Sequence, residues 1–430
     1  MWSKKNNISF PMYNWIKTMF PWHRSLSGAG NIKTLKFLKS INPNLKINNF
    51  RSGSKCFDWI IPEEWNFKKA YIKHENGKII CDTKNNNLHV VQYSIAVNKK
   101  MKKKDIQKKI YYIKKKPNSI PYVTSYYKKD WGFCLKYKDF KKMPNGNYFI
   151  KIDASHKKGK IPYGEIYYKG KTKKEVLFTT YICHPSMANN ELSGPSVSIA
   201  LSNYIKSNLK KLNYSYRFLF IPETIGSIAY IKNNLSNLKK NLICGFNLSC
   251  VGDDRAYSII QSRLGNTLAD KSLKASLKNM KKKKIYDFLS RGSDERQFCS
   301  PGVDLPYCGF SRSKYYEYKE YHTSEDNLKV VSQKGLDGSF KILKKIIDAF
   351  ETSLYPKTKY LCEPKMDKRN LYEEISYNKS YLKKNIKNRM DFLAYSDGNH
   401  SIFDIVNKCN FDLDEAIYIS NILKHNNLIY

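Results

Sequence analysis

The sequence predicts an α/β fold built on a mostly parallel central sheet, and two observations carry this prediction. Between residues 160 and 350, buried strand-like runs alternate with helix-like runs, as expected when strands are joined by crossover helices. Between residues 45 and 150, short β-branched and aromatic runs alternate with turns and predict β-sheet. We therefore expect an α/β domain accompanied by a β-rich unit.

The elements follow in order from the spacing of apolar residues. Residues 12–40 predict two helices joined by a turn, since Pro21 ends the first apolar run. Farther along, β-branched and aromatic runs predict strands, and apolar residues at helical spacing predict helices. The expected strands are 57–62, 70–72, 89–93, 148–150, 175–182, 216–221 and 242–251, and the expected helices are 194–209 and 226–235.

The C-terminal part is predicted to form a separate helical unit. Residues 356–364 have the composition of a linker, and residues 401–430 contain a helix, a turn, a second helix and a short strand, as in a winged helix. The second helix, 414–424, begins with two acidic residues and carries little Arg or Lys, which is poor for reading the major groove of DNA. We expect a structural or protein-contact role and no specific nucleic-acid partner.

The net charge of +40 comes from 77 Lys and Arg against 37 Asp and Glu. Such a charge is typical of polyanion binding. However, Lys far outnumbers Arg, is scattered along the chain, and occurs with many Asn, Ile and Tyr, as in proteins of AT-rich genomes. We interpret the charge as mainly compositional, with non-specific polyanion binding at low salt still expected. Nucleic-acid binding is the weakest of three functional hypotheses.

The sequence also predicts a cytoplasmic protein without a membrane span. No apolar run reaches the ~18 residues that cross a bilayer, and residues 1–20 lack the apolar core of a signal peptide. The ten Cys residues form no CxxC pair, and many lie inside apolar runs. Buried, reduced thiols fit this pattern better than disulfides or a zinc ribbon.

Polar side chains at strand ends are the first candidates for chemistry. His184, Glu223 and Asp253 each follow a predicted strand within a few residues, and sites in parallel sheets lie beyond the carboxyl ends of the strands. His322 lies 322 − 184 = 138 residues after His184, so only the fold can bring the two imidazoles together. Imidazoles and carboxylates are the usual ligands of zinc.

Asp294 and Glu295 lie between two Arg residues in the segment 291–296 and complete the candidates. Each candidate also has a structural interpretation. Glu223 and Asp253 precede helical patterns and are suited to capping them, and acidic residues beside Arg often form plain ion pairs. Their joint occurrence near strand ends favours the functional interpretation.

Five short segments together resemble the M28-type zinc aminopeptidase superfamily. In chain order they are Cys-His-Pro to Leu-Ser-Gly (183–194), Pro-Glu-Thr-Ile-Gly-Ser (222–227), Asp-Asp (253–254), Ser-Asp (293–294) and Tyr-His-Thr-Ser (321–324). The segments 24–28, 57–65 and 87–94 are also similar to bacterial aminopeptidase-like proteins found with polysaccharide-biosynthesis genes.

The resemblance covers nearly the whole chain and implies a definite architecture. It implies a three-layer, phosphorylase/hydrolase-like α/β domain, an inserted β-rich subdomain and a C-terminal winged helix. The expected limits are 1–44 together with 136–355 for the α/β domain, 45–135 for the inserted subdomain, and 365–430 for the winged helix.

The resemblance also implies roles for individual residues. His184 and His322 match the first and last zinc ligands of the superfamily, and Glu223 matches its general base. Asn190 stands where the superfamily has an Asp that bridges two ions, and Thr224 stands where it has a ligand Glu.

These departures predict one zinc ion rather than two. An amide cannot bridge two cations as a carboxylate does, so Glu191 or Asp253 would have to supply the missing carboxylate. The expected ligands are then His184 and His322 with Glu191 or Asp253, and Asn190, Asp294 and Glu295 are further site candidates.

Two functions remain besides nucleic-acid binding. The first is a metal-dependent, aminopeptidase-like hydrolase of an amide or peptide bond, on a peptide, amide or glycan-linked substrate, in surface-polysaccharide biosynthesis. Glu223 would take a proton from water whose pKa the metal lowers. The second is a catalytically degenerate peptidase fold that serves as a binding or scaffold module, which the lost ligands favour. Either is compatible with a homo-oligomer.

Overall fold

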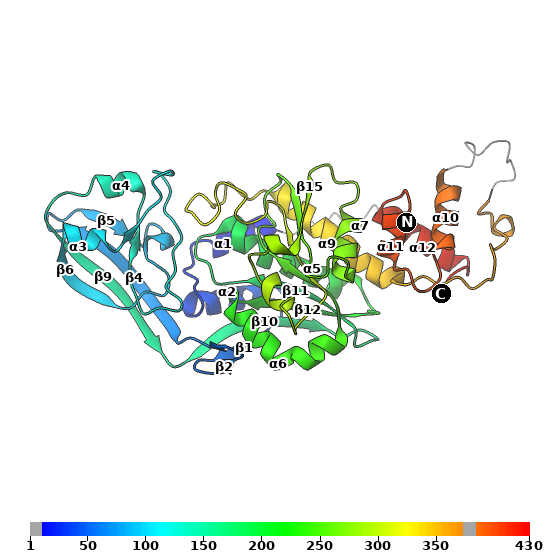
Figure 1. Ribbon diagram of the computed structural model, residues 1–430, viewed down its shortest axis with the longest axis horizontal. Coiled ribbons are helices and arrows are strands. Elements are labelled where there is room, and N and C mark those ends of the chain that lie inside the picture. Colours follow the sequence, from blue (N-terminus) through cyan, green and yellow to red (C-terminus); the bar gives the residue numbers. More distant parts are fainter. Residues whose placement is uncertain (1–10, 373–383) are drawn as a thin grey trace.

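The computed structural model describes residues 11–372 and 384–430. Three units follow one another along the long axis of the molecule, with a β-rich unit at one end, an α/β domain in the centre and a helical unit at the other end (Figure 1). Within the described ranges, no helix has both the length and the apolar character needed to cross a membrane.

An eight-stranded sheet forms the centre of the α/β domain. Strands β12, β11, β13 and β16 are neighbours that run parallel, whereas β1, β10 and β14 pair antiparallel. The mostly parallel central sheet expected from the sequence is confirmed. The spatial order is β1 (Lys46–Arg51), β10 (Lys160–Tyr168), β12 (Ser215–Ile221), β11 (Glu175–Tyr181), β13 (Leu242–Leu248), β16 (Tyr307–Ser311), β14 (Tyr257–Ile260) and β15 (Lys283–Tyr286).

Helices cover both faces of this sheet and complete three layers. Alternate residues of β11 point to opposite faces, so that Phe178 packs in one apolar core and Leu177 in the other. The first core also holds residues of α1 (Met12–Met19), α2 (Ala29–Ile41), α5 (Ser193–Asn208), α7 (Leu268–Ser276) and α9 (Gln333–Ser353), and the second holds residues of α6 (Ile225–Asn241) and α8 (Glu295–Phe298).

The β-rich unit is a separate four-stranded antiparallel sheet with its own apolar core. The predicted domain limits at 44/45 and 135/136 stay a prediction. Strand pairing places β1, which follows the first limit, in the large sheet, and β9, which follows the second, in the small one. The four strands are β5 (Ile79–Asp82), β4 (Glu64–His74), β9 (Asn147–Lys157) and β6 (Val97–Lys102), with helices α3 (Lys103–Gln107) and α4 (Tyr137–Lys141) and the short pairs β2 (Lys55–Cys56)–β3 (Trp59–Ile60) and β7 (Ile110–Tyr111)–β8 (Phe133–Cys134).

Two predicted strands of this unit differ in the structure. The strand expected at 57–62 is limited to β3, Trp59–Ile60. Residues 89–93 were expected to form a strand, but the chain there leaves a short 3₁₀ turn, η1 (Asn87–His89), and makes only single bridges at Val90 and Gln92. The amide of Gln92 explains the interruption, because its Nε2 donates to the backbone carbonyls of Asn87 and Val90. A side chain that bonds its own backbone in this way competes with a regular strand ladder.

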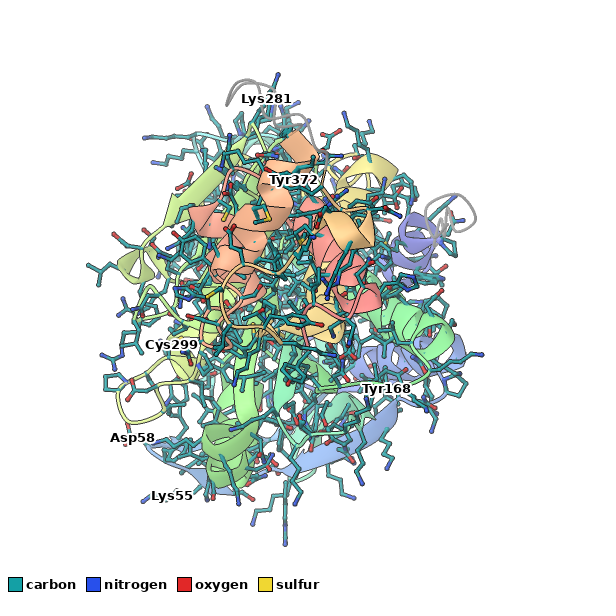
Figure 2. The ribbon with its side chains drawn as sticks, turned by 90° about the vertical axis from the view of Figure 1, so that its right-hand side faces the viewer. Lys55, Asp58, Tyr168, Lys281, Cys299 and Tyr372 are labelled. Carbon is teal, nitrogen blue, oxygen red and sulfur yellow. The ribbon has the colours of Figure 1, made fainter. Side chains whose placement is uncertain are left out.

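The C-terminal unit consists of α10 (Lys384–Ala394), α11 (Ile402–Lys408) and α12 (Leu413–His425). The helix expected at 414–424 is thus confirmed, and a bridge between Thr358 and Ile429 supplies the short extended segment. Figure 2 views the molecule from this end, where long side chains with nitrogen tips radiate from the whole rim, including Lys55 and Lys281 on opposite sides. The positive charge is therefore spread around the molecule.

Candidate metal and catalytic site

The site lies at the carboxyl edge of the parallel strands. β11 has β12 on one side and β13 on the other, and all three run in the same direction. His184 follows the end of β11, Glu223 follows the end of β12, and Asp253 follows the end of β13. The sheet thus brings residues that are far apart in sequence to one edge, as the strand pattern predicts.

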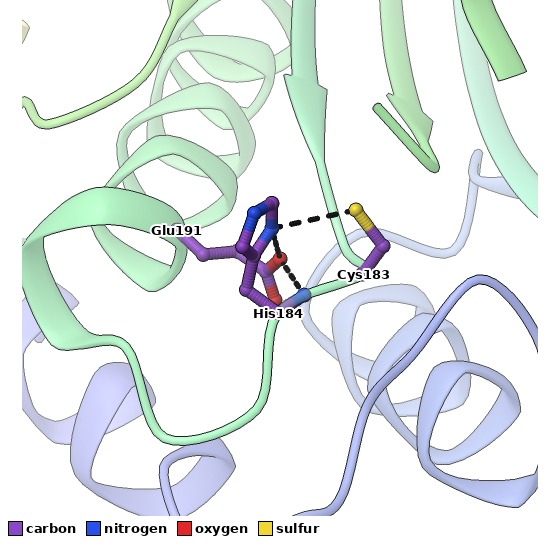
Figure 3. Close-up of side chains that lie close together, drawn as sticks. All are labelled: Cys183, His184 and Glu191. Atoms are coloured by element: carbon purple, nitrogen blue, oxygen red, sulfur yellow. Dashed lines mark hydrogen bonds and ion pairs between the residues drawn. The ribbon is translucent and has the colours of Figure 1, made fainter. Parts of the chain in front are cut away.

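His184 is held by Glu191 in a buried arrangement (Figure 3). Its Nδ1 lies 2.9 Å from Glu191 Oε2, its backbone N–H donates to the same carboxylate, and Cys183 Sγ lies 3.4 Å from Nδ1. Glu191 comes from a π-helical turn, η2 (Ala188–Leu192), at the start of α5. Such turns are rare and occur frequently at functional sites. The Nδ1 contact leaves Nε2 as the nitrogen that faces the rest of the site.

Arg24 neutralises Glu191 from the other side. Arg24 Nε lies 2.7 Å from Glu191 Oε1, and both side chains are fully buried. The guanidinium also donates to the backbone carbonyls of His184, at 3.1 Å, and of Met19, at 2.6 Å. Both oxygens of Glu191 are therefore engaged by the protein, which suits Glu191 to orienting His184 more than to binding an ion.

His322 lies beside His184, although 138 residues separate them in the chain. The two ring centroids are 5.4 Å apart, and Tyr122 packs against both rings at 5.0 and 4.9 Å. Tyr321 stacks on His322 at 3.9 Å. Among the described residues, Nε2 of His322 is buried and has no hydrogen-bond partner. A buried ring nitrogen in this state is suited to a ligand.

Glu223 lies beside the ring of His184. Its Oε2 is 3.6 Å from His184 Nε2, and its Oε1 accepts a hydrogen bond from Ser293 at 3.0 Å. The next residue, Thr224, has φ of +64°, which is strained for a β-branched residue. Its N–H donates to Asp294 at 2.8 Å, which fixes this turn at the start of α6. Strain of this kind clusters at functional sites.

The electrostatics of the site follow from its burial. Burial raises the pKa of Glu223, although His184 and Arg296 oppose the rise. Burial and the neighbouring Glu223 carboxylate raise the pKa of Asp294 to about 7. Burial and nearby His184 lower the pKa of His322 well below its usual value, so this ring is neutral. For His184, burial is outweighed by Cys183 and Glu191, which raise its pKa well above 6.5.

Asp253 and Asn190 are engaged by neighbouring loops. Asp253 accepts hydrogen bonds from the side chain of Asn189, from the backbone and hydroxyl of Ser313, and from the backbone of Arg255. Asn190 places its amide nitrogen 3.6 Å from Cys250 Sγ, and among the described residues its Oδ1 is buried without a hydrogen-bond partner. The contacts favour a structural role for Asp253, and the predicted site roles of both residues stay predictions.

Glu295 also braces a loop rather than facing the two imidazoles. It accepts hydrogen bonds from the backbone N–H groups of Gly292 and Ser293, at 2.9 and 3.0 Å, and from the hydroxyl of Tyr315. This loop also contains Ser293, which donates a hydrogen bond to Glu223. Glu295 thus supports the site by holding its loop.

Some of the described side chains that could bind a metal near His184 are already engaged by the protein. Cys183, His184 and Glu191 are the group of described metal-ligating side chains whose atoms lie within 4.8 Å of one another. However, Arg24 already neutralises Glu191, and burial raises the pKa of the Cys183 thiol to about 11. The nitrogens of His184 and His322, with Glu223 beside them, are the better candidates, and an ion there would displace the proton of His184.

Sequence reasoning did not find three residues that shape this site. Arg24 lies in the segment 24–28, whose similarity to aminopeptidase-like proteins was the one available signal. No sequence signal pointed to a site role for Tyr122 or Asp326. Asp326 is fully buried and accepts the backbone N–H groups of Asn189 and Asn190, at 2.7 and 2.9 Å, so it fixes the η2 turn from a loop 136 residues away.

Comparisons with known proteins define the class of this fold. A zinc aminopeptidase from Bacillus subtilis superposes with a TM-score of 0.57 at 15% identity, covering 78% of this chain and 93% of that chain. An M28 peptidase precursor from Shewanella amazonensis gives a TM-score of 0.54 at 12% identity, covering 82% and 94%. The molecule therefore has the fold of the M28 zinc aminopeptidases.

The chain belongs to the family described as a domain of unknown function, DUF4910, whose model matches residues 13–353. A winged helix-turn-helix model matches residues 353–430. A Clostridium acetobutylicum protein named as a polysaccharide biosynthesis protein with aminopeptidase-like domain is 38% identical, over 96% of this chain and 94% of that protein. A crystal structure from that bacterium, described as a peptidase, gives a TM-score of 0.88 at 36% identity, covering 97% and 95%.

Proposed function

We propose that this protein is a metal-dependent hydrolase of an amide or peptide bond that acts in surface-polysaccharide biosynthesis. The observation that carries the proposal is the convergence of His184 and His322, whose ring centroids are 5.4 Å apart, with Glu223 at 3.6 Å from His184. The names of the relatives support the peptide-bond chemistry and the polysaccharide context. A cytoplasmic location, which the nine buried free cysteines favour, belongs to the same proposal.

His184 and His322 would hold one zinc ion. A bound zinc ion lowers the pKa of its water towards ~7 and polarises a carbonyl group. Glu191 orients the His184 ring through Nδ1, and the burial of His322 keeps its ring neutral. Imidazole coordinates metal as the neutral ring, so zinc would bind His322 directly and would displace the proton of His184, whose pKa is raised.

Glu223 would act as the general base. Its carboxylate is one-fifth exposed, so water can reach it, and Ser293 fixes one of its oxygens. Burial raises its pKa, which makes the carboxylate a stronger base. Burial and the charge of Glu223 also raise the pKa of the nearby Asp294, to about 7.

The experiment measures bound zinc in the purified full-length chain by mass spectrometry. The wild type should hold one ion, and His184→Ala and His322→Ala should lose it while exposed His425→Ala keeps it. Glu223→Gln should keep the ion but lose hydrolysis of aminoacyl amides by about 10²-fold or more. If Glu223→Gln also loses the ion, Glu223 is a ligand; if the wild type never binds a stoichiometric ion, the hydrolase proposal is wrong.

The second candidate is a binding or scaffold module on a degenerate peptidase fold. The buried Arg24–Glu191 ion pair favours it, because a protein cation already neutralises the carboxylate nearest to His184. Asn190 in place of a bridging Asp points the same way. Under this alternative, the zinc measurement gives no ion and Glu223→Gln leaves ligand binding unchanged.

A further inference from the structure

A groove with a volume of about 760 Å³ opens between the β2–β3 hairpin and the segment 126–129. The hairpin contributes Trp59, and the segment 126–127 contributes two tyrosines, of which Tyr127 is 57% exposed. Trp59 and Tyr127 meet edge to face, with ring centroids 5.0 Å apart. Tyr93 and His156 form a second edge-to-face pair deeper in the wall, at 4.5 Å. Aromatic side chains therefore dominate the lining of this groove.

A series of aromatic contacts connects the groove to the proposed catalytic site. Tyr127 contacts Tyr126, with ring centroids 6.3 Å apart, and the hydroxyl of Tyr126 lies 2.7 Å from that of Tyr122. Tyr122 in turn packs 5.0 Å from the ring of His184. The Tyr126 hydroxyl also donates to the backbone carbonyl of Cys183, at 3.4 Å. Tyr126 and Tyr122 fill the space between the groove and His184, and the charges of Arg296 and Glu223 act on the Tyr127 hydroxyl, so the groove opens close to the proposed catalytic site.

The polar groups of the groove are largely balanced in charge. Lys129 lies 3.7 Å from Glu63, and Lys128 lies 3.7 Å from Asp130. The tyrosine hydroxyls add neutral donors and acceptors at the edges of the rings. A sugar ring matches this surface, since it has apolar C–H faces for aromatic rings and neutral hydroxyl groups around its edge. Of the three lysines that line the groove, Lys128 and Lys129 are paired and Lys158 is the one for which no ion pair is seen within the described part of the chain.

We propose that this groove binds a sugar ring of the substrate, and that the amide bond cleaved is one carried by an amino sugar. This inference rests on the proposed function and names its substrate class. Half-buried Trp59 and exposed Tyr127 provide the aromatic surfaces, and Tyr127, on which the charge of Glu223 acts, marks the part of the groove where the amide would lie. The groove determines specificity, whereas the residues at the strand ends carry the chemistry.

The test titrates the full-length protein with the β-1,4-linked tetramer of N-acetylglucosamine, followed by ligand-observed NMR. The wild type should bind the tetramer, and Trp59→Ala and Tyr127→Ala should weaken binding about tenfold each, as expected for a lost aromatic contact. Trp59→Phe should restore part of the affinity. Tyr418→Ala, at a 61% exposed tyrosine on α12, is the matched control and should bind like the wild type. Circular dichroism verifies that each variant is folded.

Tetraalanine is titrated in parallel as the alternative occupant. If tetraalanine binds and loses affinity in Trp59→Ala while the sugar tetramer does not bind, the groove is a peptide subsite and the inference is wrong. Equal binding of the tetramer to all variants, or no binding, also overturns it. Binding is measured without turnover, so a protein that binds the tetramer but hydrolyses no amide contradicts only the proposed function.

Discussion

At the scale of single residues, Glu191 has its countercharge within the protein. Arg24 and Glu191 are fully buried, and Arg24 Nε lies 2.7 Å from Glu191 Oε1, although the two residues are 167 positions apart in the chain. A buried carboxylate without a partner is strongly unfavourable. Arg24 therefore stabilises Glu191 and, through Glu191, the orientation of the His184 ring.

Arg24→Met should lower the free energy of unfolding by about 3–5 kcal/mol, because it leaves the charge of Glu191 buried and unpaired. Adding Glu191→Gln should recover part of this loss, since the stranded charge is then removed. Denaturant titration of the two single variants and the double variant measures the coupling. Strictly additive losses would show that the two residues do not act as a pair.

His23 gives the fold a dependence on pH. Burial lowers its pKa from 6.5 to about 4, with Arg24 adding to the effect, while its Nε2 lies 2.8 Å from Gln92 Oε1. The unfolded chain therefore binds more protons between pH 4 and 6.5. The stability from His23 is complete above pH 6.5 and falls, by about 3 kcal/mol, as the pH drops to about 4. His23→Phe should reduce this slope in denaturant titrations at pH 4.5 and 7.5, whereas exposed His425→Gln should not.

At the scale of elements, the segment 119–126 joins the β-rich unit to the site, and we call it the strap. Tyr122 N–H donates to the carbonyl of His322 at 2.9 Å, Ser324 N–H donates to that of Ile120 at 2.9 Å, and Pro121 bridges Thr323. His322 has φ of +50°, a conformation that few non-glycine residues adopt. The strap thus holds one imidazole in a strained backbone position.

Tyr122→Ala should loosen this part of the site. The substitution removes the ring that packs on both imidazoles. We expect the free energy of unfolding to fall by about 2–4 kcal/mol and amide exchange in residues 320–324 to become faster. Hydrogen–deuterium exchange with peptide resolution measures this change. Tyr111→Ala, at a 40% exposed tyrosine on β7, is the control. Unchanged exchange in 320–324 would show that the strap does not position His322.

The sequence predicted the parallel core of the fold because burial there dominates the pattern. β11, α5, β12 and α6 lie close to their expected ranges, since each has a continuous apolar run or an apolar helical stripe. β15 was missed, because its residues Lys283–Tyr286 are mostly exposed and rich in lysine, and only the pairing with β14 makes them a strand. Tertiary pairing decides such edge strands more than composition does.

The candidate site was predictable in part. The strand-end rule indicated His184 and Glu223, and His322 was a candidate as an imidazole that the family resemblance then matched to the last zinc ligand. The rule could not show that the carboxylates of Glu191 and Asp253 already have partners within the protein. Those partners, Arg24 and Ser313, lie far away in the chain. No local pattern encodes a hydrogen bond between residues 60 or 167 positions apart.

At the scale of the whole molecule, the C-terminal unit shares a core with the α/β domain. Phe403 of α11 lies 5.5 Å from Phe350 of α9, and both are fully buried. Lys278 Nζ, from the turn after α7, donates to the backbone carbonyl of Val406 at 2.5 Å. The apolar cluster runs without a break from the central sheet into α11 and α12. A unit attached in this way unfolds with the domain that it contacts.

Phe403→Ala should therefore destabilise both units at once. Loss of a fully buried phenylalanine costs about 3–5 kcal/mol, and the cavity opens at the contact between α9 and α11. Differential scanning calorimetry should show the α/β and C-terminal units unfolding in one transition, shifted to lower temperature in the variant, with Tyr418→Ala unchanged. A separate early transition in the wild type would mean that the winged helix is an independent domain, and its contacts with α7 and α9 would then be too weak to couple the two units.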